Sequence, residues 1–178
     1  MTGFSQFFIS LSSWLTLLSD VVIVILTITL FSNSPTLVRL RTFIGGRAIL
    51  ISFLISLGAF IGSLIFSNII GFEPCVLCWV QRIFIYPQVI MFGVALWKKD
   101  LSVFLYALPL SIIGGVVALY QSYTNFGGAG FTACTAMGSV CSKIYFMSFG
   151  FVTIPTMSLT AFLLLILVAC IKLRQQKI

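Results

Sequence analysis

The sequence predicts an all-α membrane protein, because apolar segments long enough to cross a bilayer follow one another along nearly the whole chain. Hydrophobic residues make up 60% of the 178 residues, charged residues make up only 7%, and the mean hydropathy is +1.20. A soluble domain has roughly a quarter of its residues charged, whereas about 20 apolar residues in a helix cross the hydrocarbon layer. We therefore expect one compact helical bundle within the membrane.

Hydropathy places five spanning helices at about 13–31, 48–70, 79–97, 101–122 and 150–171. The first is not a signal peptide by pattern, because no Lys or Arg precedes Arg39 and its apolar run is of spanning length. Asp20 within it is costly in lipid, so it is either a buried polar packing contact or a functional group. The predicted organisation is an N-terminal helix and loop over 1–47, followed by a four-helix domain over 48–178.

Positive charge orients the expected bundle, because basic residues concentrate in cytoplasmic connections. Eight of the ten basic residues fall in the connections 32–47 and 98–100 and in the segment 172–178. This places those segments in the cytoplasm, and it places the N-terminus and the connections 71–78 and 123–149 outside. The charges are split among separate connections, so the net charge of +7 does not indicate a nucleic-acid partner.

Four of the five cysteines lie in the two connections expected outside the cytoplasm: Cys75, Cys78, Cys134 and Cys141. Oxidising compartments on that side of the membrane favour disulfides. The fifth, Cys170, lies at the cytoplasmic end of the last span, about a membrane thickness away, and is expected to be inert packing. The four outer cysteines therefore form either static disulfides or redox-active pairs.

The sequence around Cys75 and Cys78 favours a reactive pair. Pro74 suits the first turn of a helix, so both thiols are expected at the N-terminus of the 79–97 span, where unpaired N–H groups and the helix dipole stabilise a thiolate. Arg82 lies four residues after Cys78, on the same face and one turn deeper. A guanidinium there needs a negative or accepting partner, such as a thiolate or the carbonyl of a bound carrier. The alternative is that Arg82 extends to the membrane surface.

These residues carry a resemblance to a known family. The run Pro74-Cys75-Val76-Leu77-Cys78-Trp79, then Gln81-Arg82 and a second cysteine pair in the next outward connection, resembles the DsbB family of membrane thiol oxidoreductases and its shorter, BdbC-like members. The resemblance covers roughly residues 48–171. It implies a DsbB-like four-helix transmembrane bundle in a bacterial cytoplasmic membrane, to which this chain adds one N-terminal helix.

The resemblance also implies a role for each cysteine. Cys134 and Cys141 would accept electrons from a secreted thioredoxin-like, DsbA-type protein, with Cys134 forming the mixed disulfide. Cys75 and Cys78 would reoxidise that pair, and Cys78 would pass the electrons to a membrane quinone, either ubiquinone or menaquinone.

The same resemblance implies a quinone site beside the first pair. Arg82 would hold the quinone oxygen, and Gln81 is a further candidate for the same pocket. Trp79, with Phe84 and Tyr86, would form an apolar wall, although aromatic residues at this depth also serve as plain membrane anchors.

Three smaller features leave structural alternatives open. The apolar segment 143–151 suits either a short helix on the membrane surface or the start of the last span. Gly114 and Gly115 are expected to permit close helix packing. Glu73 is placed either to move protons or to cap a helix.

Other functions are disfavoured by composition and order. The chain contains no histidine, which excludes a His-ligated haem or zinc-hydrolase site, and the single CxxC argues against a four-cysteine zinc site, so no metal is expected. The vitamin K epoxide reductase family is also four-helical and reacts with quinones, but there the loop pair precedes the CxxC. A membrane packing protein with static outer disulfides remains the alternative from a different class.

Overall fold

The computed structural model describes residues 3–31, 34–128 and 144–176, and in these ranges the secondary structure is helical apart from one isolated bridge between Ser148 and Val152. The elements in chain order are α1 (Gly3–Phe31), α2 (Pro35–Gly46), α3 (Ala48–Leu64) with its π-helical extension η1 (Ile65–Ile69), α4 (Val76–Lys98), α5 (Val103–Asn125) and α6 (Ile154–Gln176). Among these described elements, five helices, all but α2, are long and apolar enough to cross a membrane. The predicted fold class, an all-α membrane bundle, is confirmed.

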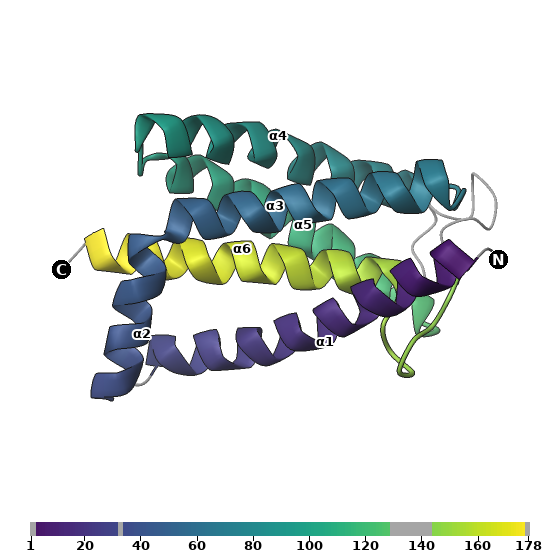
Figure 1. Ribbon diagram of the computed structural model, residues 1–178, viewed down its shortest axis with the longest axis horizontal. Coiled ribbons are helices and arrows are strands. Elements are labelled where there is room, and N and C mark those ends of the chain that lie inside the picture. Colours follow the sequence, from purple (N-terminus) through teal and green to yellow (C-terminus); the bar gives the residue numbers. More distant parts are fainter. Residues whose placement is uncertain (1–2, 32–33, 129–143, 177–178) are drawn as a thin grey trace.

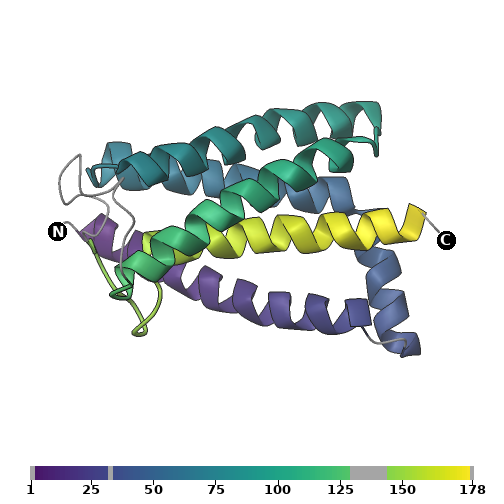
Figure 2. The same cartoon turned by 180° about the vertical axis from the view of Figure 1, so that it is seen from behind.

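The five long helices run up and down along a common direction, and α2 crosses one end of them (Figure 1). Helix α6 is central, because it packs on α5, α3, α1 and α2. Seen from behind, α5 and α6 lie in front of α3, and the N-terminus shares its end of the bundle with the connections that precede α4 and α6 (Figure 2). The C-terminus, α2 and the α4–α5 turn lie at the opposite end. The two connections that carry the cysteine pairs therefore join the helices at the same end.

The tightest helix packing is between α5 and α6. Phe104 of α5 and Phe162 and Leu165 of α6 are almost completely buried. Gly114 of α5 faces the ring of Phe162 so closely that a Cβ at this position would overlap the ring, whereas a Cβ at Gly115 would meet Phe162 at an ordinary 3.5 Å. Small residues let membrane helices approach in this way. The expected close packing at the glycine pair is confirmed, and Gly114 is the residue that requires it.

Helix α1 is bound to α6 along its length. The Asp20 carboxylate accepts a hydrogen bond from the Thr160 hydroxyl at 2.9 Å, and nearer the other end Arg174 donates to the Leu30 carbonyl at 2.5 Å. Asp20 thus makes a polar packing contact between two helices, which is the structural alternative that its position in an apolar helix suggested. Hydrogen bonding of this kind offsets the cost of a carboxyl group at membrane depth.

Three boundary expectations were wrong. Helix α1 begins about ten residues earlier than the predicted span, and the connection 32–47 contains α2, which starts at the helix-favouring Ser34-Pro35 step. Residues 144–153 form neither a surface helix nor the start of α6. They form a turn closed by the Ser148–Val152 bridge, with positive φ at Phe149 and Gly150.

Helix α6 begins at Ile154 because the preceding turn is closed by a local hydrogen bond. The Thr156 hydroxyl accepts from the Thr153 backbone N–H at 2.7 Å, which is the side-chain-to-backbone half of a capping box. Pro155 in the first turn suits this start, because the lost N–H has no partner within a helix at that position.

Candidate redox site

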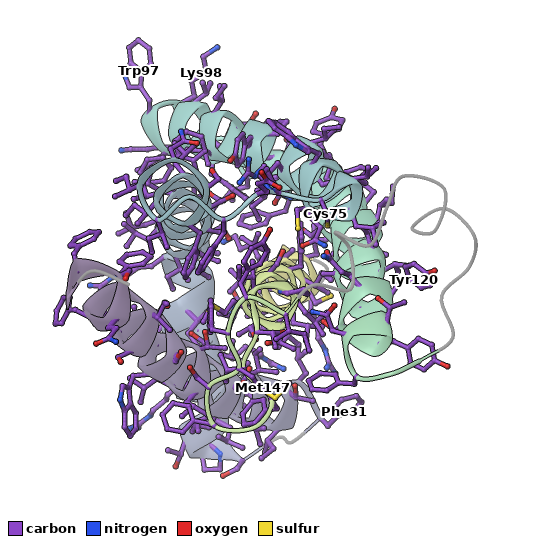
Figure 3. All side chains as sticks on the ribbon, turned by 90° about the vertical axis from the view of Figure 1, so that its right-hand side faces the viewer. Phe31, Cys75, Trp97, Lys98, Tyr120 and Met147 are labelled. Carbon is purple, nitrogen blue, oxygen red and sulfur yellow. The ribbon has the colours of Figure 1, made fainter. Side chains whose placement is uncertain are left out.

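Cys75 and Cys78 lie at the N-terminus of α4, as predicted. Cys75 is the N-cap residue, with extended backbone, and its sulfur accepts a hydrogen bond from the Cys78 backbone N–H at 3.4 Å. The helix starts at Val76, so Pro74 precedes the cap and does not form the first turn, contrary to expectation. The two sulfurs lie 3.1 Å apart. Cys75 is buried and Cys78 is half-buried, so the pair faces into the end of the bundle, where Figure 3 shows the Cys75 sulfur.

Gln121 of α5 is the nearest polar partner of both sulfurs. Its side-chain amide nitrogen donates to Sγ of Cys75 at 3.1 Å and lies 3.4 Å from Sγ of Cys78. Its carbonyl oxygen accepts from the amide of Gln81 at 2.6 Å. Both glutamines are buried. The sequence argument identified Gln81 but missed Gln121, although a glutamine in an apolar span is costly in lipid and is itself a signal of a functional contact.

Arg82 lies on the same side of α4, one turn further from the cap. Its guanidinium donates to the Ser63 hydroxyl at 2.9 Å and to the Ser63 carbonyl at 3.2 Å, and it lies over the ring of Trp79, 4.9 Å from the ring centre. The Tyr86 hydroxyl donates to the same Ser63 hydroxyl at 3.3 Å. The partners of the guanidinium therefore come from the end of α3, which neither sequence interpretation of Arg82 included. A guanidinium has five N–H donors, so the two bonds to Ser63 fix its position without using its full donor capacity.

A cavity of about 540 Å³ lies beside the dithiol, and α1, α3, α4, α5 and α6 all contribute to its lining. This volume is within the range of small-molecule sites. The polar residues that line its cysteine end include Cys75, Cys78, Gln81, Arg82, Gln121 and Asn125, together with Ser63, Glu73 and Tyr145.

Asn125 and Trp79 differ from the other predicted or observed polar and aromatic residues near this end of the cavity. The side-chain oxygen of Asn125 is buried and has no hydrogen-bond partner among the described residues. Trp79 does not line the cavity: its side chain is 54% exposed, and it contacts the site through Arg82.

An aromatic cluster joins the connection that leads into α4 to the connection that leads into α6. The ring of Phe72 stacks on Tyr145 at a centroid distance of 4.6 Å, and Phe146 packs against Phe66. The Tyr145 hydroxyl donates to the Glu73 carbonyl at 2.8 Å. Partial burial, followed by the Glu73 charge, raises the pKa of Tyr145, so the hydroxyl keeps its proton and remains a donor. Because Cys75 occupies the cap position, the interpretation of Glu73 as a helix cap was wrong.

The remaining predicted site residues are distributed as follows. Cys134 and Cys141 lie outside the described residues. Cys170 is a free thiol in α6, towards the C-terminal end of the bundle. In the described part of the chain no group of three or more His, Cys, Asp or Glu residues could hold a metal ion.

Comparisons with known proteins agree with this geometry. The family model described as disulfide bond formation protein DsbB matches residues 46–172. The chain is 42% identical to disulfide bond formation protein C of Bacillus subtilis over 122 residues, covering 67% of this chain and 88% of that protein. It is 47% identical to probable disulfide formation protein C 1 of Bacillus anthracis over 106 residues, covering 59% of this chain and 76% of that protein.

A third relative is the SPbeta prophage-derived disulfide bond formation protein B of Bacillus subtilis, which is 39% identical over 116 residues, or 65% of this chain and 78% of that protein. No solved structure matches significantly. The matched region begins at the end of α2 and includes the CxxC, Arg82 and the second cysteine pair, but not α1. The chain therefore belongs to the DsbB family, and it is a multi-pass membrane protein of disulfide bond formation with the oxidoreductase activity that this family implies.

Proposed function

We propose that this protein oxidises a secreted thioredoxin-like, DsbA-type protein and passes the electrons through two cysteine pairs to a membrane quinone. The observation that carries the proposal is the placement of the Cys75–Cys78 pair. It lies at a helix N-terminus, it accepts hydrogen bonds from Gln121, and it opens on a cavity that also contains Arg82. A static disulfide would need neither the cavity nor the donors.

The relay consists of two thiol–disulfide exchanges that conserve electrons. In the first, the reduced partner attacks the Cys134–Cys141 disulfide at Cys134, and the partner leaves as a disulfide while the pair becomes a dithiol. In the second, that dithiol attacks the Cys75–Cys78 disulfide and reduces it. Each exchange transfers two electrons, and the protons of the attacking thiols pass to the thiolates that leave.

The residues around the cavity fit a quinone. A bound quinone would accept two electrons and two protons from the Cys75–Cys78 dithiol. Arg82 would bind a quinone oxygen through N–H groups not directed at Ser63, and the charge of its guanidinium would stabilise negative charge on that oxygen. Gln81 and Gln121 hold each other in place and keep an amide directed at both sulfurs. Trp79 would act by supporting Arg82 from the outside of the cavity.

The aromatic cluster supports transfer between the two pairs. Tyr145 follows Cys141 by four residues, and its hydrogen bond to Glu73 fixes that point of the chain beside the connection that leads into Cys75. The contact holds the two cysteine-bearing connections together at one end of the bundle, which raises the effective concentration of one pair at the other.

The charge pattern supports the membrane orientation. The end of the bundle with α2, the α4–α5 turn and the C-terminus also holds Arg39, Arg41, Lys98, Lys99 and Arg174. We propose that this end faces the cytoplasm of a bacterial cell, and that the N-terminus and both redox connections face outward. In this arrangement residues 48–178 form the redox domain, and 1–47 are the addition to it.

The test uses the purified full chain in detergent, a reduced thioredoxin-like oxidase as electron donor and a water-soluble quinone as acceptor. We expect quinone-dependent oxidation of the donor. Cys78→Ser should abolish it, Arg82→Ala should raise the quinone KM, and Cys170→Ser, at the far end of the bundle, should be unchanged.

Two results would contradict the proposal. Full activity in Cys78→Ser would exclude the relay, and donor oxidation that does not depend on quinone would exclude the acceptor. Outer cysteines that resist exchange with the donor would instead support static disulfides.

A further inference from the structure

Helix α1 lies outside the family-matched region, yet one of its faces lines the cavity beside the dithiol. The lining residues recur at helical spacing on that face: Phe8, Leu11, Ser12, Leu15, Thr16 and Ser19. Residues three and four apart share one side of a helix, so this set is a continuous stripe about three turns long. On the basis of the proposed function, we propose that α1 is a wall of the quinone site and binds the apolar isoprenoid tail of the quinone.

The cavity has the two-part character that such a molecule requires. The end near Cys78, Arg82 and Gln121 is polar. In α3 the lining continues from Ser63 back to Leu54, which corresponds to about 14 Å of helix. From Leu54 to Gly62 every lining residue of α3 is apolar or glycine. A quinone, with a polar ring and a hydrocarbon tail, matches a cavity that is polar at one end and apolar along α3.

Helix α1 is held in place as a wall rather than as a loose anchor. At the cysteine end, Phe8 packs edge-on against Phe66 of η1, with ring centres 5.2 Å apart. Further along, the Asp20–Thr160 hydrogen bond joins it to α6. Between these points α1 packs along α6 but has at most marginal contact with α3, because the cavity lies between them. Without α1 this space would be a groove open on one side.

Two of the three polar residues of the α1 stripe, Ser12 and Thr16, do not compete with the tail. The Ser12 hydroxyl bonds the Ile9 carbonyl at 3.0 Å, and the Thr16 hydroxyl bonds the Ser12 carbonyl at 2.8 Å. Both hydroxyls are satisfied within their own helix, so these small side chains need no polar partner in the cavity and leave room for an apolar ligand. The stripe therefore contributes space and apolar contact, and it assigns α1 to tail binding rather than to chemistry at the sulfurs.

The experiment compares two quinones with the same ring, one without a tail and one with an isoprenoid tail, in the full chain. Ser12→Phe fills the cavity from α1, and Leu15→Ala removes an apolar contact at a position outside the buried core, where the side chain is 55% exposed. Leu18→Phe is the matched control, because Leu18 is on the same helix, is 63% exposed and does not line the cavity.

We expect the KM for the tailed quinone to rise about fivefold or more in Ser12→Phe and Leu15→Ala, corresponding to the loss of a small apolar contact area. The KM for the tail-less quinone and the rate at saturating quinone should change less than twofold. As a second readout, the tailed quinone should raise the thermal midpoint of the wild type and of Leu18→Phe, and it should raise that of Ser12→Phe much less.

The possible outcomes separate this inference from the proposed function. Wild-type KM values and wild-type thermal shifts in both Ser12→Phe and Leu15→Ala would overturn the role of α1 and leave the quinone relay standing. A wild-type protein that neither binds nor reduces either quinone would overturn the proposed function and this inference with it.

Discussion

The side-chain amide of Gln121 donates a hydrogen bond to Sγ of Cys75 at 3.1 Å, although the two residues are 46 positions apart in the chain. This contact joins the C-terminal end of α5 to the cysteine pair, because Gln121 lies four residues before the end of α5 and Cys75 caps α4. Hydrogen bonds to a charged acceptor are stronger than those between neutral groups. The amide is therefore placed to favour a thiolate on either sulfur.

Replacing Gln121 with Leu should slow the reaction of the Cys75–Cys78 pair. The sulfurs lose their side-chain donor and Gln81 loses its acceptor. A hydrogen bond to a charged group contributes about 1.5–3 kcal/mol, so we expect roughly a tenfold or greater loss of rate. The measurement is single-turnover quinone reduction by the pre-reduced protein.

Gln88→Leu is the matched control for this prediction. Gln88 is a buried glutamine of α4 that accepts from the Ser111 hydroxyl at 3.0 Å and does not line the cavity. Its loss should lower the thermal midpoint and leave the single-turnover rate within twofold. Equal rate losses in both variants would show that Gln121 acts only through stability.

Arg82→Lys should bind quinone more weakly than the wild type despite keeping its charge. A lysine presents a single ammonium group and cannot reproduce the fork that bonds both the hydroxyl and the carbonyl of Ser63 while stacking on Trp79. We expect the quinone KM to rise by about tenfold, equivalent to 1.4 kcal/mol. Steady-state kinetics over a range of quinone concentrations measures this, and an unchanged KM would indicate that charge alone is sufficient.

Tyr145→Phe should weaken the contact between the two cysteine-bearing connections. The substitution removes the hydrogen bond to the Glu73 carbonyl and keeps the stacking on Phe72. A neutral hydrogen bond contributes about 0.5–1.5 kcal/mol, so the rate of donor oxidation should fall about two- to tenfold. The quinone KM should change little, because the Tyr145 ring, which lines the cavity, is kept in place by its stacking on Phe72.

A rapid-mixing assay with reduced donor in excess measures the rate of donor oxidation separately from the quinone KM. If Tyr145→Phe changes the quinone KM and leaves donor oxidation at the wild-type rate, the Tyr145–Glu73 hydrogen bond does not assist electron transfer between the two cysteine pairs.

Gly114→Ala should destabilise the bundle, because the added methyl group overlaps the Phe162 ring. Overpacking of this kind costs about 1–3 kcal/mol. Gly115→Ala is the control on the next residue, where the nearest atom would be 3.5 Å away. Thermal unfolding in detergent should show a lower midpoint for Gly114→Ala only. Similar midpoints for the two variants would mean that α5 and α6 can separate slightly without cost.

The sequence was sufficient for the parts of the fold that depend on hydropathy and charge. The five spans follow from the length of the apolar runs. The two cysteine connections lie at the same end because successive spanning helices run in opposite directions. Helix α2 was not anticipated, because its 12 residues are too few and too polar for a span. The turn over 144–153 was also missed, since an apolar aromatic segment favours a helix unless tertiary contacts, here to Phe66 and Phe72, select another conformation.

Within the candidate site, sequence reasoning identified residues close to the CxxC and missed those that fold against it. Gln81 and Arg82 follow from spacing along α4. Gln121 and Ser63 come from α5 and α3, and no local pattern indicates which polar residue of a neighbouring helix will face the sulfurs. The contribution of α1 to the cavity was equally hidden, because the packing of an additional helix on a bundle is a tertiary property.

The position of Cys75 as the cap of α4 has a consequence for the electrochemistry of the pair. Its sulfur accepts the Cys78 N–H at 3.4 Å while the pair is in the dithiol form. Whatever stabilises the dithiol more than the disulfide raises the reduction potential, by about 30 mV for each 1.4 kcal/mol in a two-electron couple. In the proposed relay, a helix start built on this sulfur would make the pair a stronger oxidant, able to draw electrons from other thiols but dependent on an acceptor of still higher potential to be regenerated.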